Sequence, residues 1–181
     1  MKQTKRIVVE VERCLGCRSC ELACAVAHSQ SKVLERAIFE TPRPRPRIFV
    51  EGAANFAIPL QCRHCETAPC MEICPTHAVT RRGEQGPVVI EHERCIGCEY
   101  CVLVCPFGVM RMDEDRGVTL KCDLCYERLE RGQQPACVEA CLTHALEFRD
   151  ADAIATETRR RAAQAVVLSM EDRQASRQDS L

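Results

Sequence analysis

The chain has 181 residues, a formal net charge of −1 and sixteen cysteines, but no tryptophan, five phenylalanines and two tyrosines. This length suits one ordinary domain or two small ones packed together, and the few aromatic residues predict that something other than a large apolar core organises the fold. No stretch approaches the roughly 18 uncharged apolar residues that a membrane-spanning helix needs, so we expect no direct membrane insertion.

The first residues of the sequence help to predict the cellular compartment. Residues 1–6 are polar, and the apolar run 7–11 is too short for the core of an export signal. We therefore expect a cytoplasmic protein, whose reduced cysteines are metal ligands rather than the disulfides of a secreted scaffold.

The cysteines form four groups of four, and the groups repeat in pairs. Residues 8–17 match residues 88–98, and residues 69–79 match residues 136–146. The chain is therefore predicted to be a duplication of a two-group unit, with halves at about 6–80 and 87–149. The four groups are Cys14, Cys17, Cys20 and Cys24; Cys62, Cys65, Cys70 and Cys74; Cys95, Cys98, Cys101 and Cys105; and Cys122, Cys125, Cys137 and Cys141.

Short regular elements are predicted around these groups. Helical turns are expected between ligands at 19–27 and 99–104, and the alternating prolines of 42–47 favour an extended polyproline II path, which we interpret as a surface strap. β-branched runs before and after the groups predict strands at 6–11, 78–80, 87–90, 109–112 and 146–148.

A helix is predicted after the last cysteine group. Asp150 and Asp152 can cap a helix over 150–170, which either packs on its own domain or docks a partner, and the polar residues 171–181 are expected to be disordered. The fold class is therefore α+β: a duplicated, bacterial-ferredoxin-like, poly-cluster domain over 1–149 with short strands, short helices and long cysteine loops, followed by this helix.

The cysteine spacing is typical of 4Fe–4S clusters. The first and third groups have the C-x2-C-x2-C-x3-C pattern of bacterial ferredoxins, in which the fourth cysteine binds the other cluster of a pair. The second and fourth groups lengthen only the second spacer, to four and eleven residues. Gly16 and Gly97 suit a tight turn between ligands, and Pro75 and Pro106 end the helical turn after the fourth cysteine.

Other interpretations fit less well. Zinc sites take two separated C-x2-C pairs, so zinc throughout is disfavoured, although zinc or a three-iron cluster stays open for the fourth group. His64 is expected to pack or meet solvent, and His77 and His144 occupy matching positions, which suggests a shared turn geometry. No nucleophile motif, phosphate loop or nucleotide fingerprint is present in the sequence, so we expect no catalytic residue.

From residue 6 to residue 149 the chain resembles the four-cluster iron–sulfur subunits of the dimethyl-sulfoxide-reductase type. Its opening cysteine segment, residues 13–29, and its short length look most like the small cytoplasmic subunit that serves carbon monoxide dehydrogenase. Similar subunits serve hydrogenases, formate dehydrogenases and tungsten aldehyde oxidoreductases. The resemblance implies a catalytic oxidoreductase partner of one of these kinds; self-association is also open, whereas nucleic acid is not expected, because four clusters shift the net charge to roughly −9.

The resemblance also implies the ligand sets of the four 4Fe–4S clusters, pairing the first group with the fourth and the second with the third. Ala25 and Leu142 depart from the family pattern, in which proline follows the fourth cysteine. The implied sets are Cys14, Cys17, Cys20 and Cys141; Cys24, Cys122, Cys125 and Cys137; Cys62, Cys65, Cys70 and Cys105; and Cys74, Cys95, Cys98 and Cys101.

Three functions follow as hypotheses. The first is an electron relay without a catalytic site, in which electrons pass through four clusters between an oxidoreductase and an acceptor such as a hydrogenase. The second is a structural or assembly subunit whose clusters only stabilise the fold. The third, a reductase with an open iron, is disfavoured because sixteen cysteines leave no vacant ligand position on four clusters.

Overall fold

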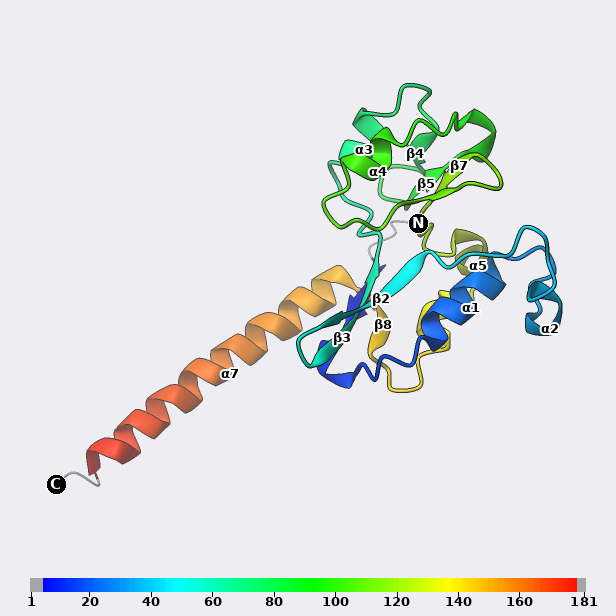
Figure 1. The fold of residues 1–181 in the computed structure, drawn as a ribbon. Helices are drawn as coiled ribbons and strands as arrows, with labels where there is room; N and C mark the ends of the chain where they lie inside the picture. The colour runs from blue at the N-terminus through cyan, green and yellow to red at the C-terminus, as the bar shows by residue number, and fades with distance from the viewer. Residues whose placement is uncertain (1–4, 179–181) are drawn as a thin grey trace. The chain divides into compact units, whose positions relative to one another are not determined.

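The computed structural model describes residues 5–178, with side chains for residues 5–170. Two compact units are distinguished: one is Ile7–Phe148, which holds all sixteen cysteines, and the other comprises Lys5, Arg6 and residues 149–178. The elements of the cysteine-bearing unit are short, as expected for a chain whose loops carry the ligands. In chain order the described elements (Figure 1) are β1 Lys5–Val9, η1 Val11–Arg13, α1 Ser19–Ala27, α2 Leu34–Ala37, β2 Ile48–Ala53, β3 Phe56–Gln61, α3 Pro69–Glu72, β4 Val79–Arg81, β5 Val88–Ile90, η2 His92–Arg94, α4 Tyr100–Leu103, β6 Arg111–Asp113, β7 Val118–Leu120, α5 Tyr126–Glu130, α6 Ala136–Glu139, β8 Leu146–Asp150 and α7 Ala151–Gln178.

The unit Ile7–Phe148 has two separate cores, which define two lobes. The core of the first lobe gathers segments from both ends of the unit, since Ile7, Ile48, Leu124 and Leu146 pack together. The core of the second lobe uses one continuous stretch of chain, from Ala68 to Met110. In Figure 1 the elements α3, α4, β4 and β5 gather in the second lobe, whereas α1, β2, β3 and β8 belong to the first.

The strands form four two-stranded sheets. β1 pairs with β8, and the other three sheets are antiparallel hairpins: β2 with β3, β4 with β5, and β6 with β7. The strands predicted at 6–11, 78–80, 87–90, 109–112 and 146–148 correspond to β1, β4, β5, β6 and β8, with no end shifted by more than two residues. The strand β7 was not predicted.

The segment interpreted as a surface strap leads into a structural hairpin that the sequence interpretation missed. Residues 42–47 contain no helix or strand, but β2 and β3 follow directly, with Ile48 opposite Gln61. Ile48 and Val50 are buried in the core of the first lobe. The strap interpretation covered residues 42–47 only, and the hairpin that follows was not predicted; the alternate apolar residues of its strand β2 face a core rather than solvent.

The helix α7 begins as predicted. Asp150 Oδ1 accepts hydrogen bonds from the backbone N–H groups of Asp152, at 3.0 Å, and Ala153, at 3.3 Å, which caps the first turn. The helix continues to Gln178, past the predicted end near Met170. The expected disorder is therefore wrong for 171–178, where the sequence contains strong helix formers and neither glycine nor proline; residues 179–181 lie outside the described residues. None of the described helices is both long and apolar enough to cross a membrane.

Candidate metal centres

The loops that carry the first and third cysteine groups have the same backbone path. Each follows a short 3-10 helix, η1 or η2, and each has its glycine in the left-handed region, with φ of +67° at both Gly16 and Gly97. Arg18 and Glu99, two residues further on, are also left-handed, at +60° and +62°. These turns fold each loop back on itself, so that its first three cysteines can converge.

Two hollows in the second lobe are lined by thiols from two groups each. One, of about 390 Å³ including space open to solvent, is lined by Cys62, Cys65, Cys70 and Cys105 among others. The other, of about 320 Å³ on the same measure, is lined by Cys74, Cys95, Cys98 and Cys101. The helices α3 and α4, which carry Cys70 and Cys101, pack against each other. The structure thus brings the second and third groups together.

The first lobe brings the first and fourth groups together in the same way. The helix α1, which carries Cys20 and Cys24, packs against α6, which carries Cys137. These three cysteines belong to one buried core, and Cys141 packs against it. Burial raises the pKa of Cys137, and the neighbouring thiols of Cys122, Cys24 and Cys125 raise it further. Cys20 raises it as well, so thiols of the first and fourth groups lie within electrostatic reach of one another.

The thiol sets have the chemistry that a 4Fe–4S cluster requires. All sixteen cysteines are free of disulfides although they converge, and backbone N–H groups already point at some sulfurs: His64 N–H donates to Cys62 Sγ at 3.3 Å, and Leu124 N–H donates to Cys122 Sγ at 3.4 Å. Such N–H groups stabilise sulfur carrying negative charge. Sets of four sulfur donors around a hollow fit cubane clusters.

Burial also sets the proton chemistry of the thiols. Burial raises the pKa of Cys20 and that of Cys70 to about 11, and the pKa of Cys125 to about 12. Without metal these thiols therefore stay protonated at neutral pH. Because thiolate is the ligand form, cluster binding must displace these protons and supplies the positive charge that keeps the sulfurs ionised.

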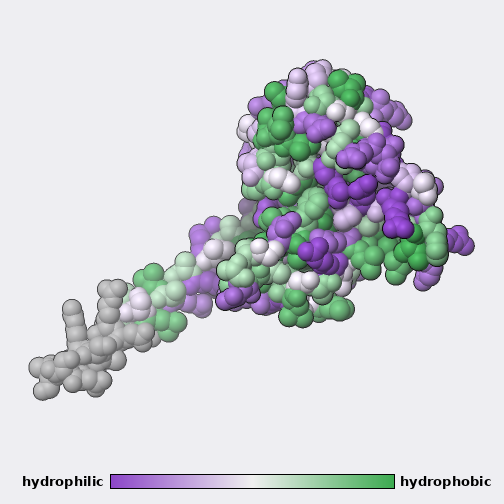
Figure 2. Space-filling view, in the orientation of Figure 1, coloured by the Kyte–Doolittle hydropathy of each residue, from purple (hydrophilic) through white to green (hydrophobic). Residues whose placement is uncertain are grey.

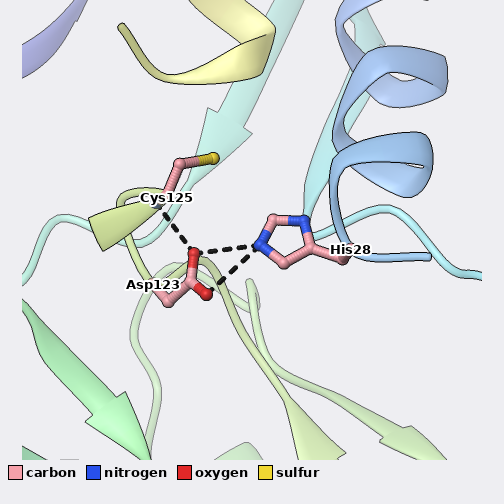
Figure 3. A group of neighbouring side chains, drawn as sticks. All are labelled: His28, Asp123 and Cys125. Atoms are coloured by element: carbon pink, nitrogen blue, oxygen red, sulfur yellow. Dashed lines mark hydrogen bonds and ion pairs between the residues drawn. The ribbon is translucent and has the colours of Figure 1, made fainter. Parts of the chain in front are cut away.

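A polar network supports the loops of the first lobe (Figure 3). Asp123 accepts hydrogen bonds from His28 Nε2 at 3.1 and 3.2 Å, from the backbone N–H of Cys125 at 2.9 Å, and from Arg47 Nη1 at 2.7 Å. Arg47 N–H donates to Cys24 Sγ at 3.3 Å. The side chains of His28, Asp123 and Cys125 could by themselves hold a metal ion. The carboxylate is already used by three donors, however, so we assign the network to positioning the cysteine loops.

The charges in this network are mutually compensated. Burial alone would lower the pKa of His28, but its hydrogen bonds to Asp123 and Cys24 outweigh burial and raise it to about 9. Burial opposes the charge of Asp123 as well, yet the hydrogen bond from His28 and the nearby Arg47 hold the pKa of Asp123 well below its usual range. The sequence interpretation missed this network. The single local indication was that His28, which follows Cys24 by four residues, lies at the C-terminal end of the same helix.

The histidines that the sequence interpretation considered are accounted for. His64 is buried, and its Nδ1 accepts the backbone N–H of Val88 at 3.1 Å, which agrees with the expected packing role. His77 and His144 have nearly the same φ, +51° and +52°, and their N–H groups donate to the carbonyls of Cys74 and Cys141. The predicted shared turn geometry is therefore confirmed.

Comparison with known proteins decides the family. The family model of the 4Fe–4S dicluster domain matches residues 53–151, more than half of the chain. The chain belongs to this family. An iron–sulfur protein of Rhodospirillum rubrum is 43% identical over 165 residues, which cover 84% of this chain and 86% of the relative.

Two further relatives of this dicluster protein indicate its role. The electron transport protein HydN of Escherichia coli K12 is 38% identical over 175 residues, covering 87% of this chain and 96% of the relative. The B subunit of the anaerobic dimethyl sulfoxide reductase of the same strain is 36% identical over 149 residues, covering 80% of this chain and 72% of the relative. The resemblance to the iron–sulfur subunits of the dimethyl-sulfoxide-reductase type is confirmed: the protein binds four 4Fe–4S clusters and is an iron–sulfur electron-transfer protein.

Proposed function

We propose that this protein is a duplicated, four-cluster relay, in which each cluster takes three cysteines from one group and the fourth from its partner group. The two thiol-lined hollows of the second lobe and the shared burial of the first and fourth groups support this assignment. The matching left-handed turns of the first and third loops support the duplication. The quartets are Cys14, Cys17, Cys20 and Cys141; Cys24, Cys122, Cys125 and Cys137; Cys62, Cys65, Cys70 and Cys105; and Cys74, Cys95, Cys98 and Cys101.

Exposure indicates where electrons enter and leave. Cys17 and Cys98 are the two exposed cysteines among the sixteen, whereas Cys24, Cys122, Cys125 and Cys137 are all buried. We therefore call the Cys17 and Cys98 quartets terminal, because each contains an exposed ligand, and the other two quartets inner, because neither does; the ligands Cys62, Cys65, Cys70 and Cys105 are all half-buried. A cluster with an exposed ligand is better placed to exchange electrons with a partner than a cluster without one.

Apolar residues surround the terminal quartets. Leu15 and Leu142, which are 77% and 83% exposed, adjoin ligands of the Cys17 quartet, and Ile96, 65% exposed, lies between two ligands of the Cys98 quartet. The face shown in Figure 2 carries green, apolar patches among purple, hydrophilic residues. Exposed apolar side chains beside a redox centre favour docking of a protein partner.

The clusters supply the one-electron chemistry when bound. The chain itself holds each cluster in place, directs N–H groups at the sulfurs and fixes the charges around them, which are the means by which a protein sets reduction potentials. For the partner we propose a catalytic oxidoreductase, with carbon monoxide dehydrogenase first and a tungsten or molybdenum oxidoreductase or a hydrogenase as alternatives. A cytoplasmic location fits sixteen thiols that must stay reduced.

Paired cysteine substitutions test the ligand assignment. If Cys20 and Cys141 bind the same cluster, Cys20→Ser and the double variant Cys20→Ser/Cys141→Ser each lose one cluster, or about four irons of about sixteen. The matched variant Cys20→Ser/Cys137→Ser loses two clusters, or about eight irons, although Cys137 and Cys141 are only four residues apart. Iron per chain is measured after anaerobic purification. The reverse pattern would contradict the assignment, and zinc in place of iron would contradict the whole proposal.

A redox titration separates the relay from a purely structural role. We expect a low-potential donor to reduce all four clusters reversibly, followed by electron paramagnetic resonance. Clusters that stay oxidised under every reductant would leave only the structural role.

A further inference from the structure

Lys121 is a charged residue in a buried position. It is 3% exposed and directly precedes Cys122, the first cysteine of the fourth group. Its ammonium donates hydrogen bonds to the backbone carbonyls of Val88 and Cys122, the latter at 2.7 Å. Within the described part of the chain no carboxylate pairs with it. Burying a cation without an anionic partner is costly, so a negative charge nearby is the natural compensation.

The two hydrogen bonds of Lys121 join the cysteine loops of the two lobes. Cys122 neighbours Cys24, a core residue of the first lobe, whereas Val88 is fully buried in the core of the second. Val88 donates its own N–H to His64 Nδ1, and His64 in turn donates its backbone N–H to Cys62 Sγ. A continuous path of hydrogen bonds therefore runs from the Cys122 loop through Lys121 to the Cys62 loop.

The positive charge of Lys121 acts on a thiol in each lobe. Lys121 directly precedes Cys122, and Val88, whose carbonyl accepts its ammonium, lines the hollow of Cys62, Cys65, Cys70 and Cys105. In agreement with this position, burial raises the pKa of Cys70 and that of Cys122, and the Lys121 ammonium opposes the rise at both. Asp123 also faces Cys122, but its charge is compensated by His28 and Arg47. The two thiols belong to the two inner quartets, one in each lobe, so the same cation faces both.

We propose that Lys121 is the cation shared by the two inner clusters, at the point where electrons cross from one lobe to the other. Each cluster with its four thiolates carries net negative charge, and reduction adds one electron more. A buried cation close to both stabilises that added charge, because opposite charges attract strongly where water is excluded. Lys121 therefore raises the reduction potentials of both inner clusters. This inference rests on the ligand assignment proposed above.

The test is a potentiometric titration of the full-length, cluster-loaded protein followed by electron paramagnetic resonance. In Lys121→Gln and Lys121→Met the positive charge is removed, and we expect two of the four clusters to shift to lower potential while the other two keep their wild-type values. The glutamine amide can still donate to a carbonyl, so Lys121→Gln separates the loss of charge from the loss of the hydrogen bonds. Lys32→Met, which removes a half-exposed lysine paired with Glu127, is the matched control and should shift none.

Other outcomes overturn the inference. Unchanged potentials in Lys121→Gln at full iron content would mean that the charge does not act on the clusters. A shift of all four clusters, or of the terminal pair, would place the cation elsewhere in the relay. Loss of iron from both variants would mean that Lys121 serves only the fold. These results are distinct from failure of the proposed function, which would appear in the wild-type protein as missing iron or as clusters that cannot be reduced.

Discussion

At the scale of single residues, the first and third cysteine loops share the same left-handed glycine conformation. Gly16 and Gly97 both lie at φ of +67°, a conformation that an L side chain adopts only at a cost. Their surroundings differ. A Cβ atom on Gly97 would lie 2.6 Å from the carbonyl oxygen of Gly117, whereas one on Gly16 would lie 3.1 Å from the Cβ of Ala57. Of these two positions, only Gly97 is one where an added side chain would overlap with rigid backbone.

This difference predicts unequal effects of the same substitution. Both Gly16→Ala and Gly97→Ala incur the left-handed strain of about 1–2 kcal/mol, but Gly97→Ala adds an overlap worth about 1–3 kcal/mol more. We expect Gly97→Ala to lose cluster absorbance at a lower denaturant concentration than Gly16→Ala. Equal midpoints for the two variants would contradict the argument.

The cysteines and glycines could be predicted from the sequence because their spacing alone defines the loop. His28, Arg47, Lys121 and Asp123 could not, because they act together only after distant segments meet. Histidine, arginine, lysine and aspartate are also common on protein surfaces, so the amino-acid type alone does not predict that these four residues are buried or half-buried. The ligand quartets could be predicted only in part. The spacing predicts the loops that supply three cysteines each, but the cluster to which each fourth cysteine binds can be assigned only from the tertiary structure or from a related protein.

At the scale of elements, the hairpin β2–β3 is the main addition to what the sequence predicted. The prolines before it indicate an extended strap, and the alternation of Ile48 and Val50 is too short a pattern to stand out beside them. The hairpin fills the core of the first lobe, where Ile48 packs with Cys20, Cys24 and Cys137. It therefore supports the cysteines of two proposed quartets without supplying a ligand.

Truncating the buried residue of this hairpin should weaken the first lobe. Ile48→Ala removes a fully buried side chain and is expected to cost about 2–5 kcal/mol. Phe56→Ala, on the exposed end of β3, should change stability by no more than about 0.5 kcal/mol. The measurement is the denaturant midpoint of the cluster absorbance under anaerobic conditions. Similar midpoints for the two variants would show that the hairpin does not support the clusters.

The helix α7, in contrast to the hairpin, is expected not to affect cluster binding. All sixteen cysteines lie in the unit Ile7–Phe148, and α7 belongs to the other unit. A chain that ends at Asp150 should therefore bind as much iron as the full chain and show the same visible spectrum. Lower iron content in the shortened chain would mean that the helix takes part in holding the clusters.

At the scale of the whole molecule, the cysteines are themselves core residues. Cys20, Cys24 and Cys137 belong to the core of the first lobe, and Cys74 and Cys101 to that of the second. Few large apolar side chains remain once these thiols are set aside, and a small core stabilises a chain only marginally. Ligation must therefore supply much of the folding free energy.

Removal of the metal should consequently unfold the chain. We expect anaerobic chelation of iron, with a reductant present to prevent disulfides, to abolish the cooperative thermal transition seen by circular dichroism. Reconstitution with iron and sulfide should restore it. A cooperative transition that persists in the metal-free protein would show that the apolar cores suffice.

The core of the first lobe gathers residues from distant parts of the chain, whereas the core of the second lobe uses one continuous stretch. The two lobes can therefore fold at different times during synthesis. The second lobe draws on Ala68 to Met110, so a ribosome can release all of its core before translation ends. The first lobe needs Ile7 beside Leu146, and contacts between such distant segments form last. The cysteines of the first group are therefore synthesised first but bind their clusters last. Until then the nascent chain depends on reducing, oxygen-poor surroundings.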